Sequence, residues 1–142
     1  MALIQRKDRI KDFRNTPVLF SDFVINVTKD PDSKDIVKVT NEDSVKSSIR
    51  NIILTDRTQR FFNAQFGCDI RKMLFENIEP TTESAIQKLI TTAVENYEPR
   101  AELLDVVVSG IEDQNAYAIT IVFNTINNVA PEKLELILTR VR

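Results

Sequence analysis

Any catalytic chemistry in this chain has to come from its carboxylate, lysine or tyrosine side chains. The 142 residues include no histidine and one cysteine, Cys68, which excludes imidazole catalysis, His-activated nucleophiles and an internal disulfide. Two carboxylates held about 5–10 Å apart could cleave a glycosidic bond. The candidates are Asp69, Glu76, Glu79 and Glu98. However, the chain has no tryptophan and only two tyrosines on which a sugar could stack, so we assign no catalytic residue.

A second arrangement of charges lies at Glu98, Pro99 and Arg100. Proline pushes the residue before it toward extended backbone, where residues i and i+2 project to the same side. The two charged groups should therefore lie close together. Because Glu98 follows a predicted helix, its charge opposes the helix dipole and calls for compensation. Two interpretations stay open: an internal ion pair at a helix-to-strand corner, or a rigid corner that presents both charges to a partner protein.

The overall charge does not select a polyanionic partner. Nineteen basic and 21 acidic side chains leave a formal net charge of −2, so neither nucleic acid nor an anionic membrane is expected. No apolar run approaches the length of a membrane span, and the N-terminus lacks the apolar core of a signal peptide. The sequence also lacks a Gly-rich phosphate loop and a Cys/His cluster, so we expect no cofactor and no metal.

The chain is sized for one domain with a single core, since 42 % of its 142 residues are hydrophobic. We expect residues 35–142 to form this domain and residues 1–34 to form an N-terminal arm that could carry a strand. The first residues of the arm are net basic: Arg6, Lys7, Arg9, Lys11 and Arg14, with Asp8 and Asp12. Such a run fits either a solvated terminus or a docking arm.

A short hairpin is predicted where the arm meets the domain. Phe23, Ile25 and Val27 alternate as in a strand. The sequence "KDPDSKD" then reads as a turn, and "DIVKVT" (residues 35–40) is the expected return strand.

Helical spacing predicts one helix over about residues 41–54 and a longer one over residues 81–97. Thr40 and Asp43 resemble a capping box before the first helix, whose apolar positions are Val45, Ile49, Ile52 and Ile53. The longer helix carries two adjacent apolar rows, Ala85, Leu89, Ala93 and Tyr97, and Ile86, Ile90 and Val94.

The segment between these helices is expected to be a loop followed by a short helix. The loop, residues 55–67, carries Phe61, Phe62 and Phe66, which should pack on the body or under a partner. Residues 68–77 have room for two or three helical turns, with Ile70, Met73 and Leu74 facing inward.

Three strand candidates follow the long helix: "ELLDVVVS", "AYAITIVFN" and "KLELILTRV", with "TINNVAPE" as the second connection. The chain should therefore form an α+β domain in which the long helix packs across an antiparallel β-meander, with shorter helices preceding it. In the last strand Leu134, Leu136 and Leu138 face one way, while Glu135, Ile137 and Thr139 face the other. If this strand lies at an edge, its unpaired backbone groups could accept a strand from another chain; if it is central or protected, they could not.

Three short motifs stand in order around the long helix: "FGCD" at residues 66–69, "LFEN" at 74–77 and "YEPR" at 97–100. Together with the surrounding run, which covers about residues 35–142, they resemble the family of baseplate wedge proteins of contractile-tailed bacteriophages. This family is related to the wedge component of type VI secretion baseplates and is often labelled lysozyme-like.

The resemblance implies a structural subunit of the virion tail baseplate that is assembled in the host cytoplasm, in several copies of a sixfold assembly. It implies that Glu98, Pro99 and Arg100 dock on a helical bundle of other baseplate wedge proteins. It also implies that the sheet, with Leu134, Leu136 and Leu138 on its edge strand, is a platform on which the tail sheath protein begins to assemble. The family's label leaves a peptidoglycan-cleaving glycoside hydrolase as the alternative.

Overall fold

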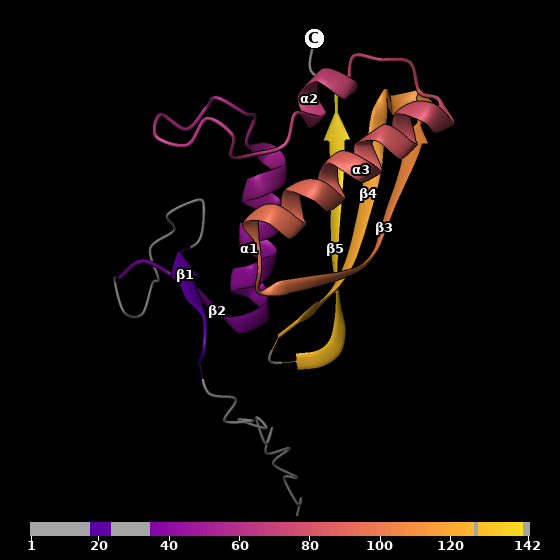
Figure 1. Cartoon of the computed structure of the whole chain (residues 1–142). Coiled ribbons are helices and arrows are strands. Elements are labelled where there is room, and N and C mark those ends of the chain that lie inside the picture. Colours follow the sequence, from indigo (N-terminus) through magenta and orange to yellow (C-terminus); the bar gives the residue numbers. More distant parts are fainter. Residues whose placement is uncertain (1–17, 24–34, 127, 141–142) are drawn as a thin grey trace, which may run out of the picture.

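A computed structural model describes residues 18–23, 35–126 and 128–140 (Figure 1). Its elements run in the order β1 (Ser21–Phe23), β2 (Lys38–Thr40), α1 (Asn41–Leu54), α2 (Ile70–Met73), α3 (Pro80–Tyr97), β3 (Ala101–Ile111), the 3-10 turn η1 (Glu112–Gln114), β4 (Ala116–Thr125) and β5 (Asn128–Thr139). The predicted α+β order, helices first and then a β-meander, is confirmed.

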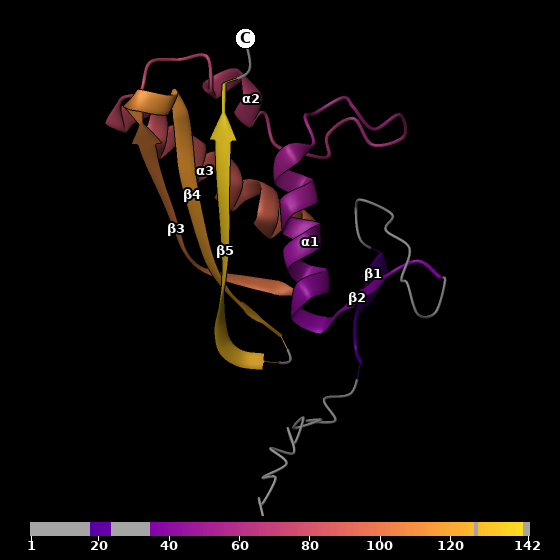
Figure 2. The same ribbon diagram turned by 180° about the vertical axis from the view of Figure 1, so that it is seen from behind.

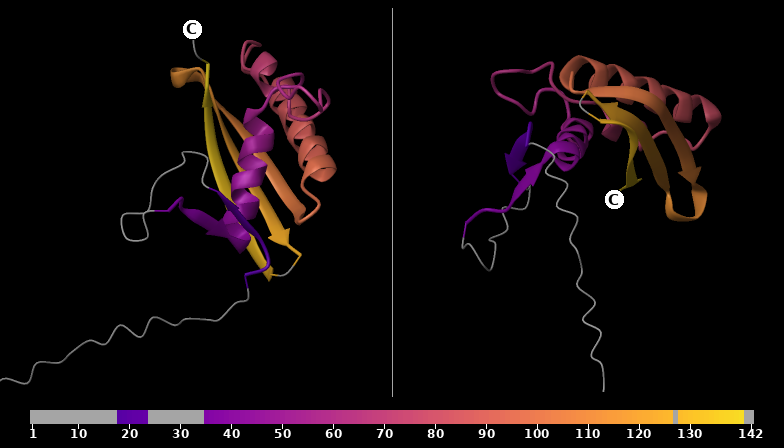
Figure 3. Two further views of the ribbon diagram at one scale, coloured as in Figure 1. Left: turned by 90° about the vertical axis from the view of Figure 1, so that its left-hand side faces the viewer. Right: turned by 90° about the horizontal axis from the view of Figure 1, so that it is seen from below.

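The three long strands form one antiparallel sheet in the order β3-β4-β5. Helix α3 lies across one face of this sheet, and the other face is not covered by any helix of the described residues (Figures 1 and 2). Seen from below, α1 stands beside the β5 edge (Figure 3, right). The architecture is therefore two layers, with a second helix closing one end of the space between them.

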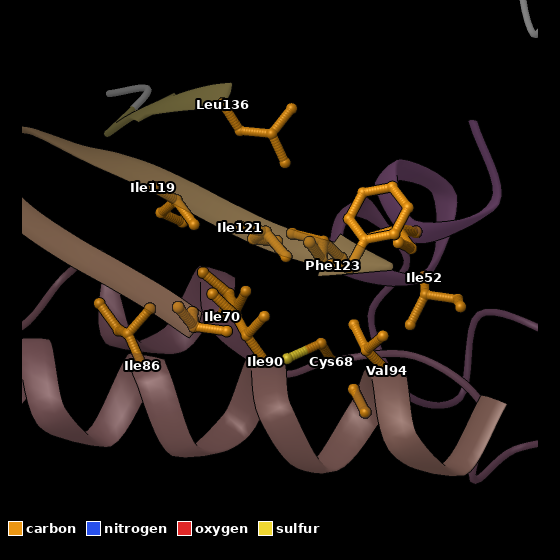
Figure 4. Packing of buried hydrophobic residues seen from close by; sticks show 14 of the residues in the cluster. Ile52, Cys68, Ile70, Ile86, Ile90, Val94, Ile119, Ile121, Phe123 and Leu136 are labelled. Carbon is orange, nitrogen blue, oxygen red and sulfur yellow. The ribbon is translucent and has the colours of Figure 1, made fainter. Parts of the chain in front are cut away.

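The core fills the space between α3 and the sheet (Figure 4). The inward positions of β4 are buried, because this central strand packs directly against the helix: Tyr117, Ile119, Ile121 and Phe123. Opposite them, α3 buries Ile86, Ile90, Ala93 and Val94. These helix residues come from the two apolar rows predicted from the sequence. The apolar face predicted for this helix is therefore the face that packs against the core.

The predicted helix over residues 41–54 is confirmed as α1, but the predicted capping box is wrong. Thr40 occupies the N-cap position without a side-chain capping bond. The next residue, Asn41, turns the chain with φ 49°, and its side-chain oxygen accepts bonds from the backbone N–H groups of Leu19 (3.0 Å) and Phe20 (3.4 Å). The start of α1 is thus fixed by attachment to the segment before β1.

The predicted hairpin is present as the antiparallel pair β1–β2, in which Asp22 lies opposite Val39. Ile25, Val27 and residues 29–34 of the predicted turn lie outside the described residues, as does the basic run over residues 6–14.

The bounds of several elements differ from prediction, most clearly those of α2 and β5. Helix α2 is one turn long, because the backbone after Met73 continues in tighter i→i−3 bonds: the N–H of Phe75 bonds Lys72 and that of Glu76 bonds Met73. Strand β5 begins at Asn128, inside the stretch predicted to be a connection. An edge strand tolerates the proline at position 131.

Candidate docking site

The Glu98–Arg100 corner lies directly after α3. Glu98 is the C-cap residue of that helix and is only 2 % exposed. Its carboxylate accepts two hydrogen bonds from Arg100, from Nε at 2.5 Å and from Nη2 at 2.9 Å. The structure therefore brings the two charges together as the extended spacing predicted, and the pair has the bidentate geometry that arginine favours.

Hydrogen bonding keeps this buried carboxylate ionised. Burial by itself raises the pKa of Glu98, but hydrogen bonds from Arg100 and Ser48, together with the charge of Arg100, lower that pKa below its usual value. The same hydrogen bond raises the pKa of Arg100. Ser48 lies on α1, so the corner joins the end of α3 to a second helix. Sequence reasoning missed Ser48, although its position three residues after Val45 places it on the inward stripe of α1.

The two charges differ in their access to solvent. Glu98 is enclosed, whereas the side chain of Arg100 is 29 % exposed and Pro99 is exposed. The guanidinium carbon of Arg100 also lies 5.2 Å from the centre of the Phe20 ring. A partner at this corner would meet the outer side of the guanidinium and the proline ring, with the carboxylate fixing the guanidinium from behind.

The loop over residues 55–67 is attached to the helix end beside the corner. The hydroxyl of Tyr97 donates to the carbonyl of Gln65 at 2.5 Å, and the Phe66 and Tyr97 rings lie 4.9 Å apart. Arg60 stacks on the Phe66 ring at 3.6 Å. Phe66 therefore packs on the body as predicted, while Phe61 and Phe62 lie fully in solvent.

The "FGCD" motif closes this loop. Gly67 has φ 110°, and a Cβ atom there would stand 2.3 Å from the carbonyl oxygen of Thr55. That oxygen accepts a hydrogen bond from the N–H of Cys68 at 2.8 Å. The Cys68 side chain is buried, and burial raises the pKa of its thiol to about 11. The glycine and the cysteine are therefore both explained by packing.

The structure places β5 at one edge of its sheet. Leu136 is buried and Leu134 and Leu138 are partly buried, whereas Glu135 and Ile137 are exposed. This is the predicted alternation. In the part of the chain that the structure describes, no strand pairs with the outer side of β5.

Hydrogen bonding shows which β5 residues face the open edge. The N–H of Arg140 donates to Asn115 at 3.2 Å, on the β4 side. Because backbone groups alternate in an antiparallel pair, Leu138 also bonds toward β4, while Ile137 and Thr139 direct their N–H and C=O groups outward. Sequence reasoning assigned the edge to the leucines and missed these two residues. Side-chain alternation alone does not show which residues bond to β4.

A groove of about 590 Å³ lies beside this open part of β5. It is mostly apolar, and its lining consists of Ile53, Leu54, Ile70, Arg71, Leu74, Phe75, Ile137, Leu138, Thr139 and Arg140. The other half of β5 is linked to α1, through Lys46–Glu132 at 2.7 Å and Asn128–Glu42 at 3.1 Å. The C-terminal half of the strand is thus the half that combines outward backbone groups with an apolar groove.

Neither the groove beside β5 nor a second, small cavity is lined by two of the carboxylates proposed for catalysis, although burial and the charges of Glu83, Glu76 and Glu79 raise the pKa of Tyr117, which lines the small cavity. Asp69 is paired with Lys72 at 3.4 Å, Glu79 is the N-cap residue of α3, and Glu98 is held by Arg100. Glu76 lines a small cavity of about 100 Å³ that contains no second carboxylate, and no carboxylate lines the larger groove. Moreover, the pKa of Glu98 is lowered, whereas a general acid needs a raised pKa.

Among residues 18–23, 35–126 and 128–140, no group of three or more Cys, Asp or Glu could hold a metal ion. No helix of the same ranges is both long and apolar enough to cross a membrane.

Comparison with known proteins gives concordant matches. Residues 39–128 match the family model of baseplate wedge protein gp25. The baseplate wedge protein gp25 of Enterobacteria phage T4 is 37 % identical over 105 residues, which cover 74 % of this chain and 78 % of that protein. A Geobacter sulfurreducens protein of known crystal structure, provisionally described as a tail lysozyme, is 29 % identical in sequence, with a TM-score of 0.65. The match covers 71 % of this chain and 92 % of that one.

Two baseplate assemblies contain chains of the same fold. A chain of the anti-feeding prophage baseplate has a TM-score of 0.61 at 17 % identity, and the match covers 87 % of each chain. A chain of the type VI secretion baseplate complex has a TM-score of 0.60 at 16 % identity, and the match covers 70 % of this chain and 93 % of that one.

Proposed function

The chain belongs to the family of baseplate wedge protein gp25, and on that premise we propose that it is a structural, non-enzymatic subunit of a contractile tail. It docks on other wedge proteins through the Glu98–Arg100 corner, and it starts the tail sheath on its sheet. The observation that carries this proposal is the open edge of β5, where outward backbone groups adjoin an apolar groove. A surface of this kind is suited to strand addition.

The corner supplies a preorganised cation for docking. Two hydrogen bonds from Arg100 to the buried Glu98 fix the orientation of the guanidinium before a partner arrives. Less side-chain freedom is therefore lost on binding. The matching surface is an acidic or carbonyl-rich site on the helical bundle of the larger wedge proteins. A sixfold arrangement in the tail baseplate, formed in the host cytoplasm, is consistent with the sixfold symmetrised anti-feeding prophage baseplate.

The sheet supplies the starting register for the sheath. An extended segment of the sheath protein can bond to Ile137 and Thr139 while its apolar side chains enter the groove beside Leu138. Side-chain alternation then sets the position of the added strand, because a slip by one residue would turn its apolar side chains to solvent.

The Ile137→Pro variant tests this platform. Proline removes the outward N–H of residue 137 and leaves the bonds between β5 and β4 in place. Loss of one backbone bond at the interface should reduce the number of sheathed tails by about tenfold. The measurement is electron microscopy of tails made by a gene cluster that lacks this chain and is complemented with each variant.

Two controls separate pairing from folding. Ile137→Ala keeps the N–H and removes only part of one side chain of the groove lining, so it should reduce sheath assembly less than Ile137→Pro does. Leu138→Pro removes a bond toward β4 and should destabilise the free domain. If Ile137→Pro proteins melt like wild type and still produce fully sheathed tails, β5 is not the platform.

The alternative is peptidoglycan cleavage, the activity that the description of the Geobacter sulfurreducens protein suggests. We expect the purified chain to release no soluble fragments from peptidoglycan, because neither the groove nor the small cavity is lined by two of its candidate carboxylates. A dye-release assay with hen lysozyme as the positive control measures this. Turnover that a single carboxylate substitution abolishes would replace our assignment with the hydrolase.

A further inference from the structure

Two adjacent aromatic side chains, Phe61 and Phe62, occupy the tip of the loop over residues 55–67. Phe61 is 98 % exposed and Phe62 is completely exposed. The loop projects beyond the C-terminal end of α3 (Figure 3, right). Neither ring contributes to the core of this chain. Adjacent apolar rings left in water are characteristic of surfaces that a partner covers.

The loop that carries these rings is held in shape at several points. The N–H of Thr58 donates to Ala64 at 2.9 Å, which closes the loop just below the tip. At the base, the N–H of Cys68 bonds Thr55, and Phe66 is buried against Tyr97. The tip is therefore presented by an ordered support, which lowers the entropic cost of binding.

The segment over residues 55–72, which carries the tip, has a net positive charge, with four basic side chains and two acidic ones. Arg57 has a side chain that is 46 % exposed, and it lies 4.0 Å from Asp69, which also pairs with Lys72. Arg60, which precedes Phe61 in the sequence, is a second cation of the loop and stacks on the Phe66 ring. The nearby acid Asp56 is paired with Arg71 at 3.4 Å. A partner surface that accepts the tip should therefore combine an apolar pocket with an acidic rim.

We propose that Phe61 and Phe62 insert as a pair into an apolar, acid-rimmed pocket on a different subunit of the baseplate. A second copy of this chain is a poorer match, because its own apolar groove has Arg71 and Arg140 in its lining. Like charges would then face each other across the contact. The contact is separate from the Glu98–Arg100 corner. The inference rests on the proposed function in one respect, namely that the partner is a subunit of the baseplate.

The Phe61→Ala/Phe62→Ala double variant tests the contact. The probe is the wedge subcomplex, purified from cells that express the same gene cluster without the gene for this chain. It is titrated with labelled full-length protein. Two aromatic anchors at the centre of a contact predict that the double variant binds at least about 100-fold more weakly. Asn63→Ala, on the same loop, is the matched control and should bind within about twofold of wild type. Both variants should melt like wild type, because the substituted side chains are exposed.

A charge variant and a crosslink identify the pocket. Arg57→Glu should weaken binding about tenfold in low salt and less in high salt, as expected for an acidic rim. A photoreactive phenylalanine analogue at position 62 should crosslink, in assembled tails, to an apolar segment of another baseplate subunit. Crosslinks only to a second copy, or binding of the tip to vesicles of phosphatidylglycerol and phosphatidylethanolamine in place of the subcomplex, would overturn the proposal.

The corner variant Glu98→Met/Arg100→Met, measured in the same titration, distinguishes this inference from the proposed function. Wild-type binding by the Phe61/Phe62 variant refutes the tip contact alone. Wild-type binding by the corner variant refutes the corner docking alone. If the wild-type chain does not bind the subcomplex, both are refuted.

Discussion

The Arg100→Met variant is expected to lose about 2–4 kcal/mol of unfolding free energy, because it leaves the Glu98 carboxylate buried without its main partner. We place the value below that of a fully buried pair, since part of the Arg100 side chain is exposed. Urea unfolding of the purified domain measures it. Lys133→Met is the control, because Lys133 and Glu135 form a pair that is largely exposed, and its loss should change stability by less than about 1 kcal/mol.

The Glu98→Met/Arg100→Met double variant separates stability from docking. Replacing both members of a buried pair with apolar groups of similar size is often close to neutral, so the double variant should recover to within about 1 kcal/mol of wild type. It should still fail to enter baseplates, because the surface guanidinium is gone. A stable double variant that assembles normally would show that the pair serves folding only.

The pH dependence of stability gives a second measurement of the same pair. The pKa of Glu98 is lower in the folded protein than its ordinary value, so its contribution is present above the unfolded pKa and is lost as pH falls through the folded pKa. In Arg100→Met the hydrogen bonds and the charge of Arg100 that lower this pKa are removed while the hydrogen bond from Ser48 remains, so acid destabilisation should begin at a higher pH. Unchanged acid profiles would contradict the assignment of Arg100 as the group that keeps Glu98 ionised.

Gly67→Ala is expected to destabilise the domain by about 3 kcal/mol or more. Two effects combine: φ 110° is unfavourable for an L side chain, and the added Cβ would collide with the backbone oxygen of Thr55, which could not move without losing its bond to Cys68. Thermal and urea unfolding measure the loss.

Gly110→Ala is the matched comparison. A Cβ at Gly110 would lie 2.2 Å from Cγ2 of Ile78, a side chain that packs against the core and would have to shift. We expect a smaller loss than at Gly67, about 1–3 kcal/mol, because the obstacle is a side chain and not the backbone. Equal losses for the two substitutions would show that the strain at Gly67 is not the cause.

The sequence predicted best those elements whose periodicity is set by one large buried face. The stripe of α3 was recognisable because Ile86, Ile90 and Val94 recur at helical spacing and face a single sheet. The alternation of β4 was equally clear, because one of its faces is buried throughout. The ends of elements were less predictable. Asn41 turns the chain through a contact with residues that are distant in sequence, and Pro131 lies in an edge strand.

For the docking site, the sequence predicted only that the charged groups of Glu98 and Arg100 lie close together. Pro99 implied that Glu98 and Arg100 meet, and the structure shows their pairing. The sequence did not indicate that Glu98 is buried or that Ser48 contacts it. These facts depend on how α1 packs against the end of α3. The outward direction of the Ile137 backbone likewise depends on the register between β4 and β5, which composition does not encode.

The buried thiol of Cys68 has a practical consequence for a particle that leaves a reducing cell. Since the thiolate is the form that oxidants and alkylating reagents attack, burial and a pKa of about 11 both slow the reaction of this thiol after release into an oxidising medium. The chain contains no other cysteine. A maleimide fluorophore placed at an engineered surface cysteine would therefore label that site alone, and the native protein would give no background signal.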